Sequence, residues 1–136
     1  MTKISNIKCI NLDRIVDARG AISIVESSRT IPFDIKRVYF LYDVPGGAER
    51  GGHAHIDLEQ LIISVSGSFN ITVSDGVDEK TFHLNRSYNC LYLPSGLWRT
   101  LENFSSGSVC LVLCSEHYRE SDYIRDFDEF LRFKNT

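Results

Sequence analysis

The sequence has no long hydrophobic run and no excess of positive charge. Nowhere does it approach the roughly 20 apolar residues that cross a bilayer. Its first residues, MTKISNIKCINL, alternate polar and apolar side chains, so we expect neither a secretory signal nor a membrane span. Lys and Arg number 15 against 18 Asp and Glu, a net charge of -3, which provides no general positive field. We therefore expect a protein that binds neither nucleic acid nor a membrane.

Cysteine is scarce as well, and its positions do not favour disulfides. The four cysteines, Cys9, Cys90, Cys110 and Cys114, lie among Ile, Leu and Val. If residues 109–114 form a strand, Cys110 and Cys114 are about 13 Å apart, which is too far for a disulfide. Buried free thiols in a cytoplasmic protein are the expectation.

Nothing in the composition indicates disorder or a fibrous protein. The 136 residues are 43% hydrophobic and 24% charged, which is ordinary for a globular chain. This length suits one domain spanning residues 1–136. Gly and Pro recur at short intervals between runs rich in Val, Ile, Tyr, Phe and Leu. Short strands with regular turn signals predict an all-β sandwich or barrel.

Three segments indicate particular elements. Phe69, Ile71 and Val73 alternate with polar residues, as in a strand with one face toward solvent. The run LIISV at 61–65 is apolar on both faces, which suits a strand covered on both sides, for instance by a second sheet or a subunit partner. Only the C-terminus predicts a helix, at about 122–133, with Ser121 or Asp122 as its cap.

The residues that indicate chemistry are clustered between 47 and 67. His53 and His55 lie two apart, so in a strand they share a face, and Glu59 has the same parity. This pattern resembles the first motif of the cupins, in which a Gly precedes His-x-His, a Glu and a second Gly. Gly47 and Gly67 occupy the outer positions, with seven residues rather than the usual six before the last Gly.

The second cupin motif is present with one departure. Pro94, Gly96 and Asn103 have the right offsets, but Arg99 stands where cupins carry a metal-binding His. A guanidinium is always cationic and has no lone pair to donate to a metal. We therefore predict a site that uses no metal and no other cofactor, although the two histidines could also be solvated strand residues.

A closer resemblance covers nearly the whole chain. The string RGGHAH followed by EQLI and SGS, the early DARG, the segment LPSGLWRTLENFS and the terminal DYIRDFDEFL are similar to the dTDP-4-oxo-6-deoxyglucose 3,4-ketoisomerases. The resemblance implies a cupin, that is, a double-stranded β-helix or jelly roll, acting as a metal-independent isomerase. It also implies a homodimer that exchanges N-terminal strands, in the biosynthesis of 3-amino-3,6-dideoxy sugars for bacterial surface glycans such as lipopolysaccharide O-antigen.

The resemblance also implies roles for individual residues. Such an enzyme moves a carbonyl from carbon 4 to carbon 3 of a dTDP-linked 4-oxo-6-deoxyhexose through an enediolate. His53 would be the base and His55 its orienter or a second proton carrier, since histidine titrates near neutrality. Tyr39 would shuttle a proton, unless it is an ordinary strand aromatic, and Arg99 would stabilise the anionic enediolate.

Three further residues are candidates for substrate binding. Arg50, on the Gly-rich approach to the histidines, would bind the pyrophosphate. Arg19, in DARG, could reach the sugar or be a plain turn residue, and Glu59 could fix a His tautomer or form a core salt bridge. Two alternatives stay open, a dTDP-sugar 3,5-epimerase and a non-catalytic sugar-nucleotide-binding cupin. The gluco or galacto configuration of the product is not predicted.

Overall fold

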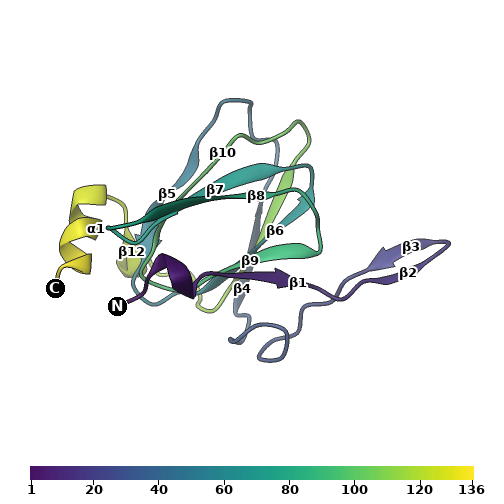
Figure 1. Ribbon diagram of the computed structural model, residues 1–136, viewed down its shortest axis with the longest axis horizontal. Coiled ribbons are helices and arrows are strands. Elements are labelled where there is room, and N and C mark those ends of the chain that lie inside the picture. The colour runs from purple at the N-terminus through teal and green to yellow at the C-terminus, as the bar shows by residue number, and fades with distance from the viewer.

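Two antiparallel five-stranded sheets pack face to face in the computed structural model, which describes residues 1–136 (Figure 1). The first sheet has the order β1 (Lys8–Asn11), β9 (Asn89–Leu93), β6 (Gln60–Ser66), β11 (Val109–Cys114) and β4 (Arg37–Leu41). The second has the order β12 (Tyr123–Ile124), β5 (Arg50–His55), β10 (Trp98–Glu102), β7 (Phe69–Ser74) and β8 (Glu79–Leu84). The predicted all-β jelly roll with a short C-terminal helix is confirmed.

The strand patterns explain how the two sheets pack. Phe69, Ile71 and Val73 of β7 are fully buried, as their alternation predicted. In β6, Ile62 belongs to the core between the sheets, whereas Leu61 and Ile63 face the other way. Residues of this same chain, among them Leu12, Ile31 and Phe33, cover that outer face. The outer face of residues 61–63 is therefore covered by another segment of the same chain. Val65, at the end of the run, is exposed.

The C-terminal helix begins later than predicted. Residues Glu120–Asp122 form a 3-10 turn (η2), and Tyr123 and Ile124 pair with His55 and Ala54 at the edge of the second sheet. The helix α1 spans Phe127–Lys134, because the Asp126 side chain accepts the N–H of Glu129 at 3.0 Å and so caps it there. Asp122, predicted as the cap, is buried and serves another purpose, described below.

The N-terminal segment leaves the body of the protein. A 3-10 turn (η1, Ile4–Asn6) and β1 precede a hairpin of β2 (Ile15–Asp17) and β3 (Gly20–Ile22), which extends away from both sheets (Figure 1). All six strand residues of this hairpin are exposed. Cys9 on β1 is also exposed, so the predicted burial is wrong for Cys9 and correct for the other three cysteines, and all four are free. No helix is long and apolar enough to span a bilayer.

Candidate active site

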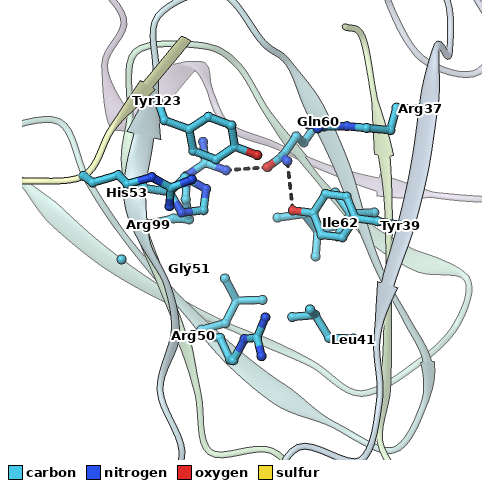
Figure 2. Close-up of a pocket in the computed structure, with 14 residues that line it drawn as sticks. Arg37, Tyr39, Leu41, Arg50, Gly51, His53, Gln60, Ile62, Arg99 and Tyr123 are labelled. Atoms are coloured by element: carbon cyan, nitrogen blue, oxygen red, sulfur yellow. Dashed lines mark hydrogen bonds between the residues drawn. The ribbon is translucent and has the colours of Figure 1, made fainter. Parts of the chain in front are cut away.

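A cavity of about 390 Å³ lies between the two sheets, and strands of both sheets supply its walls (Figure 2). Strand parity explains most of its lining. On β4, Arg37, Tyr39 and Leu41 are two apart and face the cavity together. On β6, Gln60 and Ile62 do the same, so the first sheet contributes both polar and apolar groups to one wall.

A β-bulge shapes the opposite wall. In the pairing of β5 with β10, His53 is opposite Arg99 and Arg50 is opposite Leu101, so β5 carries one extra residue between these pairs. Gly51, within the bulge, has φ +72°, a conformation that favours glycine. Because of the extra residue, Arg50 and His53 both line the cavity although they are three apart.

Arg99 is the most unusual lining residue, since its guanidinium is buried with no carboxylate partner. Only 1% of the residue is exposed. Its Nη1 donates to Oε1 of Gln60, and Nε and Nη2 each lie 3.4 Å from the carbonyl oxygen of Leu97. Burial lowers the pKa of Arg99 to about 10, so the group remains cationic near neutrality. A buried, uncompensated cation is a prepared site for an anion or a developing negative charge.

Gln60 connects Arg99 to Tyr39. Its Oε1 accepts from Arg99, and its Nε2 donates to the hydroxyl oxygen of Tyr39 at 3.1 Å (Figure 2). Burial raises the pKa of Tyr39 to about 12, so this hydroxyl is protonated near neutrality. The three side chains come from β10, β6 and β4, and they form one continuous polar wall.

His53 and His55 occupy different layers of the site. His53 lines the cavity, whereas His55 is fully buried behind it, with the two ring centroids 4.8 Å apart. Burial and the charge of Arg99 lower the pKa of His53 to about 2, so its ring is uncharged near neutrality. The same two causes lower the pKa of His55 to about 2, and a carboxylate lies next to its ring.

That carboxylate belongs to Asp122, which sequence reasoning missed. Its Oδ2 lies 3.0 Å from Nδ1 of His55, and its Oδ1 accepts the backbone N–H of Asp57 at 2.7 Å. With His55 neutral, Nδ1 carries the proton that Asp122 accepts, and Nε2 is unprotonated. Asp122 therefore holds His55 in one tautomer and one orientation.

The cavity is positively charged although the chain as a whole is acidic. Four arginines line it, and no Asp or Glu does. Arg125 is paired with Glu120 at 2.7 Å, but Arg37, Arg50 and Arg99 have no ion-pair partner. Figure 2 shows Arg50 at the opposite end of the cavity from Gln60. Such a set of guanidinium groups suits an anionic ligand with more than one charged group, such as a diphosphate.

Two predicted site residues lie elsewhere. Glu59 does not reach a histidine; its carboxylate accepts from the hydroxyl of Tyr92. The parity argument was wrong for Glu59 because β5 ends at His55 and a turn separates it from β6. Arg19 lies in the turn of the β2–β3 hairpin, bonds Asp17 and has 90% of its side chain exposed, away from this chain's own cavity.

Arg37, Gln60, Tyr123 and Arg125 also line the cavity but were not predicted. For two of them a signal existed. Arg37 has the parity of Tyr39 on β4, and Gln60 has the parity of Ile62 on β6. Tyr123 and Arg125 fell within the segment that was expected to be helical.

No group of three or more His, Cys, Asp or Glu is arranged to hold a metal ion. The fold and cavity define a small cupin in which a buried arginine replaces the metal-binding histidine. Residues 5–135 match the model of the family described as "FdtA: WxcM-like, C-terminal", and the chain belongs to that family, which confirms the resemblance found in the sequence.

Its relatives are isomerases of nucleotide-linked sugars. The TDP-4-oxo-6-deoxy-alpha-D-glucose-3,4-oxoisomerase of Aneurinibacillus thermoaerophilus is 39% identical over 93% of this chain and 91% of its own. A 3,4-ketoisomerase from Helicobacter canadensis is 44% identical, with a TM-score of 0.94 over 96% of this chain and 98% of its own. QdtA, a sugar 3,4-ketoisomerase from Thermoanaerobacterium thermosaccharolyticum in complex with TDP, is 37% identical, with a TM-score of 0.95 over 97% and 96%.

A 3'-monoepimerase from Streptomyces bikiniensis, ChmJ, has the same fold at greater distance. It is 18% identical, with a TM-score of 0.76 over 90% of this chain and 71% of its own. At that identity only the fold is shared. The epimerase reading is therefore much less well supported than the ketoisomerase reading.

Proposed function

We propose that this protein converts TDP-4-oxo-6-deoxy-D-glucose to a TDP-3-oxo-6-deoxyhexose as a 3,4-ketoisomerase. One observation carries this proposal: His53 and Tyr39 line opposite walls of one cavity, and Arg99 is buried beside them in place of a metal ligand (Figure 2). An enolisation needs a carbon base, a proton carrier for oxygen and a positive group for the developing anion. The family relationship identifies the sugar nucleotide on which these groups act.

The reaction follows from the roles of these groups. Neutral His53 removes the proton from carbon 3, and the electron pair forms the double bond between carbons 3 and 4. Arg99, already cationic and desolvated, stabilises the negative charge on the enediolate oxygen. The imidazolium of His53 then returns a proton to carbon 4, while the oxygen on carbon 3 becomes the new carbonyl. His55 does not line the cavity and acts by supporting the ring of His53.

The nucleotide half of the substrate lies toward Arg50. Because Arg50 is at the other end of the cavity from Gln60, a sugar bound beside His53 and Arg99 places its diphosphate toward Arg50 (Figure 2). Arg37 lies at the other end of the cavity, beside Gln60, so it is not part of this diphosphate end (Figure 2). The guanidinium group of Arg50 would bind phosphate oxygens through charge-assisted hydrogen bonds.

The active unit in this proposal is a homodimer with exchanged hairpins. Large apolar side chains are exposed on the β2–β3 hairpin and on the outer face of β4 and the residue after it, which together favour burial against a second copy. These residues are Ile15, Val16, Ile22, Val38, Phe40 and Tyr42. In such a dimer Arg19 would leave its own subunit and complete the partner's cavity.

The cellular setting is proposed on similar grounds. Four free thiols favour the reducing cytoplasm, where sugar nucleotides are made. A 3-oxo-6-deoxyhexose is the form that a transaminase converts to a 3-amino sugar. We place the protein in the biosynthesis of 3-amino-3,6-dideoxy sugars for bacterial surface glycans such as the O-antigen.

Proton NMR of TDP-4-oxo-6-deoxyglucose with the purified protein in heavy water tests the function. A 3,4-ketoisomerase yields the 3-oxo product, in which deuterium from the solvent can stand at carbon 4 and not at carbon 3, because carbon 3 is now the carbonyl. Deuterium at carbons 3 and 5 would identify a 3,5-epimerase instead. A protein that binds the nucleotide, makes no 3-oxo product and introduces no deuterium would be a non-catalytic binder, and the proposal would be wrong.

A further inference from the structure

The amide of Gln60 has only one orientation that satisfies its neighbours. The side chain is buried, with 1% of the residue exposed, and it lies between Arg99 and Tyr39. A guanidinium can only donate, so the amide oxygen must face Arg99. The amide nitrogen then faces the hydroxyl of Tyr39 at 3.1 Å and the sulfur of Cys114 at 3.7 Å. The reversed amide would place donors against the donors of Arg99.

This orientation determines what Tyr39 can do. Since Nε2 of Gln60 donates to it, the Tyr39 oxygen acts as an acceptor in that bond. Its own proton has no acceptor among the groups of the protein, because the bond from Gln60 is the only one the hydroxyl makes. Tyr39 lines the cavity, so its O–H is available there to a bound sugar. Burial, which raises its pKa, keeps this proton in place until a substrate oxygen takes it.

We propose that Gln60 is a positioning residue that makes Tyr39 the proton donor to the sugar oxygens. Arg99 orients the amide of Gln60, and Gln60 orients the hydroxyl of Tyr39, so one buried arginine determines the direction of a proton on the far wall of the cavity. This inference rests on the proposed function and adds the route of the oxygen-bound proton to it.

The proton transfers balance without any further reactant. When His53 takes the proton from carbon 3, the π electrons of the carbon 4 carbonyl move to its oxygen, which takes the proton of Tyr39. The resulting tyrosinate, beside the Nε2 donor of Gln60, then removes the proton from the oxygen on carbon 3. That oxygen forms the new carbonyl as carbon 4 takes the proton from His53. Tyr39 and His53 both return to their starting forms.

Gln60→Glu tests this proposal because it changes polarity while almost preserving shape. A carboxylate still accepts from Arg99, but toward Tyr39 it can only accept, so the Tyr39 proton turns away from the cavity to bond it. We expect turnover to fall by about 100-fold, in the range of a lost general acid. Affinity for TDP should stay within about threefold of the wild type, since Gln60 does not contact the proposed diphosphate end.

A double-variant comparison separates positioning from general damage. If Gln60 acts through Tyr39, Gln60→Glu should slow the Tyr39→Phe enzyme clearly less than it slows the wild type, the remaining loss coming from the new carboxylate's pairing with Arg99. Gln60→Met, which has a similar size and no polar group, is the second probe in case the charged variant does not fold. It should reduce turnover in wild type and change little in the Tyr39→Phe background.

The outcomes are distinct from those that test the function itself. Wild-type protein that makes the 3-oxo product under the same conditions supports the proposed function whatever the variants do. Gln60→Glu with near wild-type turnover would overturn the role of Gln60. The same conclusion would follow if either Gln60 variant slowed the Tyr39→Phe enzyme as much as it slows the wild type.

Discussion

Nδ1 of His55 lies 3.0 Å from Oδ2 of Asp122, and both side chains are buried. The carboxylate also accepts the backbone N–H of Asp57, so it joins the end of β5 to the turn that precedes β12. The His55 ring in turn meets the His53 ring at an interplanar angle of 83°. Asp122, although it does not line the cavity, thus supports the ring that supports the proposed base.

Asp122→Asn should therefore lower the stability of the protein and reduce its turnover. An asparagine has one accepting oxygen, so it either leaves one of the two N–H groups unpaired or donates to Nδ1 and forces His55 into the other tautomer. We expect the free energy of unfolding to fall by about 1–3 kcal/mol. Urea unfolding and product NMR measure the two effects. Ser121→Ala, at the exposed neighbouring position, is the matched control, and equal effects from both changes would contradict this role.

His53→Asn should leave the protein folded and almost inactive. The half-buried ring makes no hydrogen bond through Nε2, so its removal breaks no structural bond at that atom. Loss of a positioned base reduces turnover by about 10²- to 10⁴-fold. The rate of product formation by NMR measures this, with circular dichroism as the check on folding. Activity close to wild type would show that another group is the base.

Acid should destabilise the folded protein below about pH 6.5. The pKa of buried His55 is lowered from 6.5 to about 2 on folding. Below pH 6.5 the unfolded chain binds a proton at this ring that the folded chain does not. The free energy of unfolding therefore decreases as pH falls, by about 1.4 kcal/mol per pH unit from His55 alone. The lowered pKa of His53 acts in the same direction.

Urea midpoints at pH 7.5 and 5.5, at one protein concentration, measure this loss. His83→Gln, which removes an exposed histidine, is the matched control for the substitution itself. A midpoint that does not change between these two pH values would show that the buried histidines are not held neutral.

Substitution of Arg50 should weaken nucleotide binding. Arg50→Ala removes a cation from the proposed diphosphate end of the cavity (Figure 2). A charge-assisted hydrogen bond contributes about 1.5–3 kcal/mol, so we expect TDP affinity to fall by about 10- to 150-fold. Calorimetric titration with TDP measures it. Arg86→Ala, an exposed arginine that bonds only the backbone of Asn85, should bind as wild type.

Subunit mixing should reveal the exchange of hairpins. In the proposed dimer, each cavity combines the His53 of one subunit with the Arg19 of its partner. Inactive His53→Asn and impaired Arg19→Glu proteins, unfolded and refolded together, should recover about a quarter of wild-type activity, because each hybrid has one intact site. Mixing without refolding is the control. No recovery would place both residues of a site on one chain.

The sequence predicted best what depends on regular alternation. The pattern at Phe69, Ile71 and Val73 reports a strand because side chains on a pleated strand alternate between faces. Motif spacing likewise led to His53 and Arg99, and the family resemblance led to Tyr39; all three line the cavity.

Features that depend on irregular or distant pairing were missed. A two-residue strand such as β12 is too short for any periodicity, so Asp122 was read as a helix cap rather than as a partner 67 residues from His55. The parity of Glu59 was counted through a turn that interrupts the strand. The role of Gln60 depends on the relative positions of three side chains on three strands, and a local sequence pattern does not contain that information.

Because the β2–β3 hairpin extends away from its own subunit, the amount of active enzyme depends on the concentration of chains. In the proposed assembly a newly made chain holds only part of a catalytic centre, and its remaining part arrives by encounter with a sister chain. At low expression the concentration of finished centres would rise with the square of the number of chains made. Enzyme activity would then be very low at basal transcription and would increase steeply with a modest increase in messenger RNA.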